Sequence, residues 1–137
     1  MHVGFNRILY FCHFMLHKSA IMHQSDIHIK VTLDADKIPA NIQWNASDST
    51  AEEPQQAKAM MMAFWDGIDK SALRIDLWTK EMMVDEMADF YYQNLMSMAD
   101  TFARATQHKE LVEDMKAFAK SFYQKFREIQ LQQNKLV

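Results

Sequence analysis

Three stretches of the chain alternate apolar and polar residues with a period of two. They are residues 27–34 (Ile-His-Ile-Lys-Val-Thr-Leu-Asp), 42–46 (Ile-Gln-Trp-Asn-Ala) and 73–78 (Leu-Arg-Ile-Asp-Leu-Trp). This alternation is typical of half-buried β-strands, because successive side chains of a strand point to opposite faces of its sheet. Residues 36–39 (Asp-Lys-Ile-Pro) predict a turn between the first two strands, and the polar residues 45–56 predict a loop after the second.

A fourth strand is predicted over residues 58–65 (Lys-Ala-Met-Met-Met-Ala-Phe-Trp), whose apolar residues occupy both faces of an extended chain. It ends at Asp66-Gly67, and we interpret it as forming a hairpin around Gly67 with residues 73–78. A strand that is apolar on both faces needs cover on both. The protein's own helices are expected to cover one face, and a partner subunit is a candidate for the other. A homo-oligomer, a dimer or larger, is therefore expected.

The final third of the chain carries two apolar stripes with helical spacing, separated at residues 106–108. The first stripe is Val84, Met87, Tyr91, Leu95, Met98, Phe102 and Ala105, and the second is Leu111, Met115, Phe118, Phe122, Phe126 and Ile129. Steps of three and four residues place each stripe on one face of an amphipathic helix. The predicted fold is α+β: a four-stranded antiparallel sheet followed by two long amphipathic helices packed on one of its faces.

The two ends of the chain differ from this domain, which is predicted to span residues 23–130. Residues 1–22 contain no acidic residue and include a short apolar run at 8–12. A signal peptide is one interpretation, but histidines interrupt its apolar part, which is far shorter than the roughly 20 residues that span a bilayer. We favour a non-native or disordered extension with translation starting at Met15 or Met22. Residues 131–137 are expected to fray.

Composition narrows the class of function. Apolar residues make up 49% and charged residues 24% of the 137-residue chain, as in ordinary folded domains. The formal net charge of -3 gives no reason to expect a nucleic-acid partner. The single cysteine, Cys12, cannot form an internal disulfide, so a reduced, cytoplasmic location without stable membrane insertion is expected.

The search for catalytic or metal-binding patterns yields none. Of the six histidines, His13 and His17 are the one pair with the four-residue spacing that sets two imidazoles on one helix face, and both lie in residues 1–22, outside the predicted domain. Asp34-Ala35-Asp36 resembles the start of a calcium loop, but Pro39 stands where such a loop needs glycine. There is no glycine-rich phosphate loop and no G-x-S-x-G motif. No catalytic, cofactor or metal site is therefore predicted, and we do not expect an enzyme.

Two features suggest protein contacts instead. Methionines cluster at 60–62 and 82–83, and adaptable methionine surfaces serve partner grooves, although methionine is also common core filler. The polar face of the last predicted strand combines charges with an aromatic anchor; the alternative is a cross-strand ion pair beside a packed tryptophan. The candidate protein-contact residues are Met61, Trp65, Arg74, Asp76 and Trp78.

Several segments, in the same order and with similar spacing, resemble the gliding-motility protein family GldC. They are residues 25–31, 38–39, 42–44, 57–61, 64–66, 73–80, 84–87 and 101–106, of which Leu-Arg-Ile-Asp-Leu-Trp-Thr-Lys at 73–80 is the most specific. The resemblance covers about residues 23–126. Two departures stand out: Met83 occupies a position where the family pattern has proline, which would loosen the entry into the following helix, and residues 1–22 have no counterpart.

The resemblance implies a cytoplasmic accessory protein of gliding motility in Bacteroidetes-type bacteria, a machinery tied to outer-membrane adhesins and their secretion. Other gliding or secretion proteins are then the implied partners, and the family offers no catalytic residues to transfer. A competing hypothesis is an export holdase, because the order of four strands followed by two helices is similar to that of the SecB chaperone. A holdase predicts a long exposed apolar groove, whereas an assembly subunit predicts one compact patch.

Overall fold

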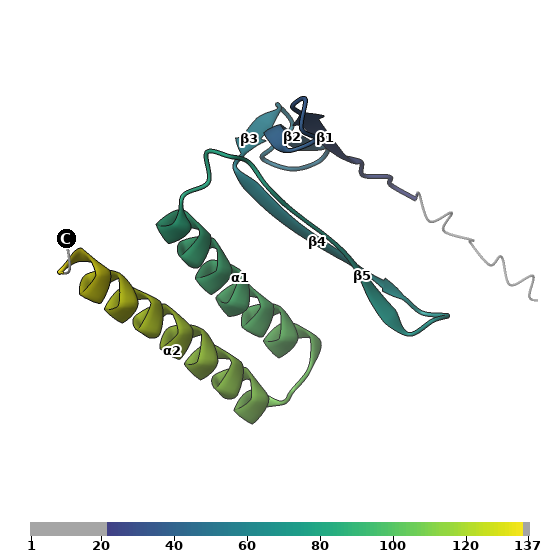
Figure 1. The fold of residues 1–137 in the computed structure, drawn as a ribbon. Helices are drawn as coiled ribbons and strands as arrows, with labels where there is room; N and C mark the ends of the chain where they lie inside the picture. The colour runs from purple at the N-terminus through teal and green to yellow at the C-terminus, as the bar shows by residue number, and fades with distance from the viewer. Residues whose placement is uncertain (1–21, 136–137) are drawn as a thin grey trace, which may run out of the picture.

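The computed structural model describes residues 22–135 and confirms an α+β chain with antiparallel sheets and two helices. Figure 1 shows three parts: a three-stranded sheet at one end, a long hairpin that extends away from it, and a helix pair beside the hairpin. The predicted N-terminal extension lies outside the described residues, apart from Met22.

The three-stranded sheet has the order β1 (Ile27–Leu33), β2 (Pro39–Ala46), β3 (Gln55–Ala57). Val31 of β1 lies opposite Ile42 of β2, which in turn lies opposite Ala57 of β3. The predicted turn between β1 and β2 is confirmed, and its shape follows from Asp34. One carboxylate oxygen of Asp34 accepts hydrogen bonds from the backbone amides of Asp36 and Ile38, each at 2.9 Å, as in an Asx-turn.

The hairpin consists of β4 (Ala59–Asp66) and β5 (Ser71–Trp78), as predicted, joined by residues 67–70. Only Lys58 separates β3 from β4, and the chain bends there. The extended stretch from β3 through β4 therefore pairs first with β2 and then with β5.

This bend makes the predicted four-stranded sheet wrong: the structure has one sheet of three strands and one of two. Gln55 and Gln56 fall within the loop predicted over residues 45–56, because they carry no apolar alternation, yet with Ala57 they form β3. They are a strand because β2 offers its free edge to their backbone, which the side-chain pattern does not reveal.

The two helices are α1 (Val84–Ala105) and α2 (Lys109–Asn134), and the predicted break at 106–108 is confirmed. They pack closely because Ala99 and Ala119 are both fully buried between them. An ion pair between Lys116 and Asp100 joins them at 2.8 Å. The α2 helix continues through Asn134, so residues 131–134 are helical where the sequence predicts fraying.

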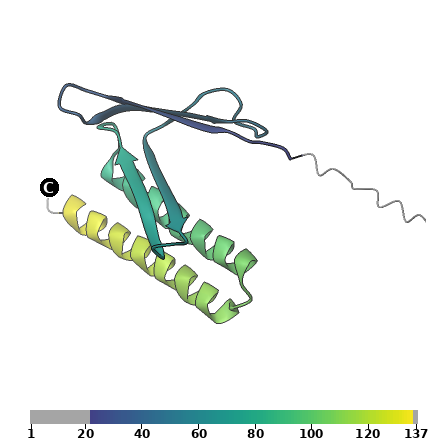
Figure 2. The same cartoon turned by 90° about the vertical axis from the view of Figure 1, so that its right-hand side faces the viewer.

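Few large side chains are buried in this arrangement. Ile42, which is 1% exposed, is the one large apolar side chain among the described residues that is less than 2% exposed. Figure 2 shows why: the hairpin alone lies across the helix pair, and the three-stranded sheet lies beyond one end of it. The sequence predicts that the helices cover one face of a single sheet, and the structure does not have this arrangement. Much apolar surface of the described residues therefore stays exposed.

Candidate interaction surface

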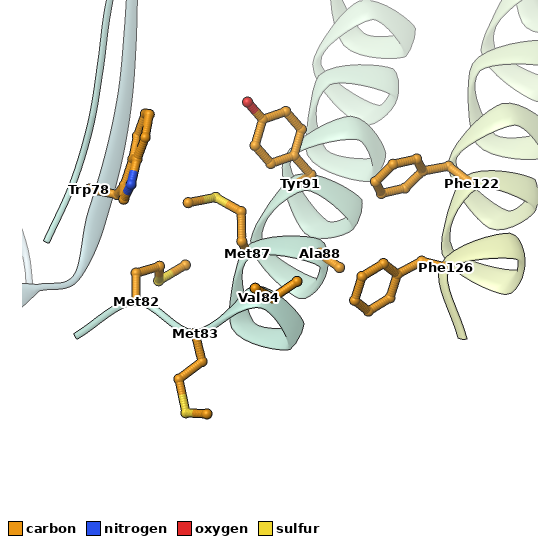
Figure 3. Close-up of a pocket in the computed structure, with 9 residues that line it drawn as sticks. All are labelled: Trp78, Met82, Met83, Val84, Met87, Ala88, Tyr91, Phe122 and Phe126. Carbon is orange, nitrogen blue, oxygen red and sulfur yellow. The ribbon is translucent and has the colours of Figure 1, made fainter. Parts of the chain in front are cut away.

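An open apolar groove lies between the helix pair and the base of the hairpin, which is the start of β4 and the end of β5. Its first section has a volume of about 500 Å³. Figure 3 shows side chains from the end of β5, from the connection to α1 and from both helices around it. The residues that line it are Trp78, Met82, Met83, Val84, Met87, Ala88, Tyr91, Phe122 and Phe126.

The groove continues through two further sections. A second, of about 200 Å³, lies between the hairpin base and α1, and a third, of about 310 Å³, reaches β1 and β2 of the other sheet. The first and second sections share Trp78, Met87 and Tyr91, and the second and third share Ala59, Met60, Met61 and Phe90. These three sections together are called the apolar groove below. It is elongated, because it runs from α2 across the hairpin to the three-stranded sheet.

The start of α1 is fixed against the strand bend, and this contact sets one wall of the groove. The ammonium of Lys58 donates to a Glu86 carboxylate oxygen at 2.7 Å, and the backbone amide of Met83 donates to the other at 3.0 Å. The hydrogen bond from Lys58, followed by that from Met83, lowers the pKa of Glu86. The same contact raises the pKa of Lys58. Because proline has no amide hydrogen, a proline at position 83, which the resemblance to GldC implies, would lose this bond.

A second polar contact joins the β1–β2 turn to the segment after β5. Asp34 forms an ion pair with Lys80, and this hydrogen bond is the largest cause that lowers the pKa of Asp34. Next to it, the amide of Thr79 donates to the carbonyl of Lys58 at 2.7 Å. Thr79 is buried, and its hydroxyl has no hydrogen-bond partner among the residues that the structure describes. Both contacts position the sheet, the hairpin and α1 around the groove.

The candidate contact residues fall into two groups. Met61, Asp76 and Trp78 line the second section of the groove. Trp65, which is 70% exposed, and Arg74 lie further along the hairpin and line no section of it.

The Arg74–Asp76 ion pair, at 3.0 Å, lies within one strand. The cross-strand alternative is therefore wrong: Ala63 and Met61 are the residues opposite Arg74 and Asp76. Trp78 beside it is 57% exposed, so it is not a packed tryptophan.

The methionines at 60–62 are half-buried in the groove wall. They lie between the two alternatives that the sequence left open, an adaptable partner surface and core filler. Sequence reasoning assigned Tyr91, Phe122 and Phe126 to helix stripes facing the core. Helical periodicity identifies the apolar face of a helix but not whether anything covers that face. The part of these three aromatic residues in an open groove was therefore missed.

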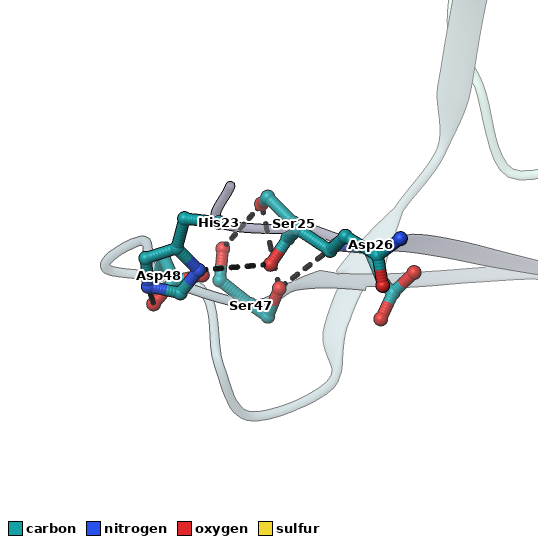
Figure 4. Close-up of polar contacts among 6 residues, drawn as sticks. His23, Ser25, Asp26, Ser47 and Asp48 are labelled. Carbon is teal, nitrogen blue, oxygen red and sulfur yellow. Dashed lines mark hydrogen bonds and ion pairs between the residues drawn. The ribbon is translucent and has the colours of Figure 1, made fainter. Parts of the chain in front are cut away.

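Polar groups at the outer end of β1 and β2 form a separate cluster, shown in Figure 4. The Ser25 hydroxyl donates to the Ser47 carbonyl at 3.1 Å, and the Asp26 amide donates to the Ser47 hydroxyl at 2.8 Å. The His23 ring nitrogen Nε2 lies 3.7 Å from an Asp48 carboxylate oxygen. These side chains are mostly exposed and close the end of the strand pair, so the cluster reads as structural.

Within residues 22–135, no three histidine, cysteine, aspartate or glutamate side chains lie close enough together to hold a metal ion. Neither helix of this part of the chain is long and apolar enough to cross a membrane.

Comparison with known proteins supplies the family. Residues 39–128 match the model of a family described as gliding motility-associated protein GldC-like. No curated protein matches the chain, and no solved structure does. The match covers the second strand, both strands of the hairpin and most of the helix pair, and so includes most of the groove. On this match, the chain belongs to the GldC-like family of gliding motility-associated proteins.

Proposed function

We propose that the protein is a non-enzymatic, cytoplasmic accessory protein of the gliding machinery that acts by binding other proteins through the apolar groove. Its partners in the groove are other gliding or secretion proteins, and it also associates with a second copy of the chain. The observation that carries the proposal is the amount of large apolar surface left uncovered along the groove. Trp78 is 57%, Met83 63% and Val84 74% exposed. Contiguous apolar surface of this kind marks protein interaction sites.

The lining of the groove favours a protein partner over a small substrate. Its first section contains no charged side chain, and catalysis needs convergent polar groups. Four methionines, Met60 to Met62 and Met87, contribute to the second and third sections. Their flexible side chains adapt to different apolar partners. The net charge of -3 offers no attraction for nucleic acid.

The proposal is tested by placing a charge in the groove. Met87 is half-buried and lines two of its sections, so Met87→Arg should abolish partner binding while leaving most of the fold in place. Gln93→Arg is the matched control, because Gln93 is exposed on the same helix and lines none of the three sections. Circular dichroism establishes that both variants are folded.

Each variant is expressed in a gliding bacterium that lacks the native protein. The control should restore gliding and cross-link to the same gliding proteins as wild type, whereas Met87→Arg should do neither. Full gliding with folded Met87→Arg would contradict the proposal.

The elongated shape of the groove also fits the export-holdase hypothesis, but the comparisons give no support to a SecB relationship. A direct assay separates the two roles. Wild-type protein is added to an unfolded client in a stoichiometric amount. If it prevents aggregation of the client, and Met87→Arg does not, the holdase role is favoured. We expect no such protection.

A further inference from the structure

Within residues 22–135, the outer half of the hairpin is exposed on both faces. Residues 63–65 of β4 and 71–76 of β5 are all exposed, including Phe64 at 54%, Leu73 at 60% and Ile75 at 46%. A two-stranded hairpin is marginally stable in water unless further strands or a helix complete it. Within the described residues, β5 pairs only with β4, so its other edge is open. Figure 2 shows no strand beside that edge.

The direction of the β5 backbone groups follows from one hydrogen bond. The Thr79 amide donates toward β4, to the Lys58 carbonyl at 2.7 Å. Alternate residues of an antiparallel strand direct their N–H and C=O groups to the same side. Residues 71, 73, 75 and 77 therefore bond to β4 as Thr79 does. The four residues between them direct their backbone groups to the open edge: Ala72, Arg74, Asp76 and Trp78.

The side chains of β5 are self-complementary about Ile75. Leu73 and Leu77 stand at equal distances on either side of it, as do Arg74 and Asp76, which carry opposite charges. In an antiparallel pair of two such strands centred on Ile75, each arginine lies opposite the aspartate of the other strand. Opposite charges directly across a strand pair are stabilising, and like charges are destabilising. The leucines then also lie opposite each other, on the other face of the sheet.

We propose that two copies of the chain associate through the open edges of β5, antiparallel and with Ile75 opposite Ile75 of the second copy. The inference rests on the proposed protein-binding function and names one of its partners. Residues 72, 74, 76 and 78 are the ones that exchange backbone bonds in this register, which gives about eight interstrand hydrogen bonds. The two hairpins become one four-stranded sheet, which meets the requirement for independent stability.

The other open edge of the hairpin lacks this complementarity. By the same alternation, β4 presents Ala59, Met61, Ala63 and Trp65 at its outer edge, and none of these is charged. Nothing there fixes a register between two copies. The charge pattern therefore favours β5 as the dimer edge.

Charge reversal tests the register. In the full-length chain, Arg74→Asp or Asp76→Arg alone places like charges opposite each other at two positions of the dimer. Each variant should dimerise at least about tenfold more weakly than wild type in sedimentation-equilibrium analysis. An equimolar mixture of the two variants restores opposite charges across the strands, so it should form heterodimers with near wild-type affinity.

The mixture separates this interface from the ion pair within the strand. Mixing cannot restore the intrachain Arg74–Asp76 pair, so recovery in the mixture reports only on contacts between chains. Lys125→Asp and Asp114→Arg, both at exposed positions of α2, are the matched controls and should dimerise like wild type. A monomeric wild type, unimpaired single variants, or a mixture that stays monomeric would each overturn the proposal.

Cross-linking tests the register independently of charge. Directly opposed residues whose backbone groups face away from each other have Cα atoms about 4.5 Å apart, within the disulfide range. With Cys12→Ser as background, Ile75→Cys should form an interchain disulfide. Leu73→Cys should not cross-link alone, because its two copies lie roughly 13 Å apart in this register. It should cross-link when mixed with Leu77→Cys. Reduced Ile75→Cys alongside self-linked Leu73→Cys would refute the register.

These readouts measure assembly and not motility. Arg74 lines no section of the groove, so if Arg74→Asp loses the dimer but supports gliding, the groove proposal stands and the dimer is dispensable for it. If Met87→Arg dimerises but does not support gliding, the two surfaces act separately. The two proposals can therefore fail one at a time.

Discussion

Replacing Ile42 tests the claim that the core is small and that this residue is its centre. Ile42 is 1% exposed, pairs with Val31 and Ala57 across the sheet, and borders the third section of the groove. Ile42→Ala removes the equivalent of three methylene groups, which costs about 2.4 kcal/mol at roughly 0.8 kcal/mol each. A cavity term adds to this, but the neighbouring groove lets the site relax and admit water. We expect a total loss of about 2–3 kcal/mol, near the lower end of the usual range.

The assay is urea unfolding followed by circular dichroism, at one fixed protein concentration because assembly would shift the midpoint. Ile68→Ala is the matched control: Ile68 is 92% exposed in the hairpin loop, so its replacement should change the free energy of unfolding by less than about 0.5 kcal/mol. Ile42→Val should fall between, at about 1 kcal/mol. Equal losses for Ile42→Ala and Ile68→Ala would refute this account of the core.

Three further predictions concern packing and charge. Ala99 is fully buried between the helices, so Ala99→Leu should overpack them and cost about 1–3 kcal/mol in thermal unfolding, whereas Ala103→Leu, at an exposed position, should not. The lowered pKa of Glu86 means that its ionised form stabilises the fold above its ordinary pKa of 4.5, and that this contribution is lost as the pH falls through the lowered value; Glu86→Gln should flatten the acid limb of a plot of Tm against pH. The same sign holds for Asp34, so Asp34→Asn should lower Tm at pH 7 and reduce its dependence on pH below about 4, and an unchanged profile would contradict the role of Lys80.

Met83 stands where the resemblance to GldC implies proline, and α1 starts directly after it. Its backbone angles, φ -83° and ψ 159°, are extended and close to those that proline adopts. The expectation that methionine would loosen the entry into α1 overlooks its amide, which Glu86 accepts at 3.0 Å. Proline would fix the start of the helix by its rigid φ, whereas Met83 fixes it through the hydrogen bond from its amide.

The sequence by itself determined the secondary-structure elements other than β3. Alternation at 27–34 and 73–78 predicted β1 and β5, and the break at 106–108 separated α1 from α2 within a residue or two. Even the hairpin partner of β5, apolar on both faces, was predicted. These features are local, because side-chain period and turn residues are set by neighbours a few positions away.

Only the tertiary structure decided how these elements share their surfaces. The bend at Lys58 splits the strands into two sheets, since backbone pairing at residues 55–57 depends on a free edge that distant residues supply. The same bend carries the hairpin beyond the three-stranded sheet, so stripes predicted to face a core line an open groove instead. Periodicity shows which face of an element is apolar, whereas its cover depends on where the rest of the chain lies.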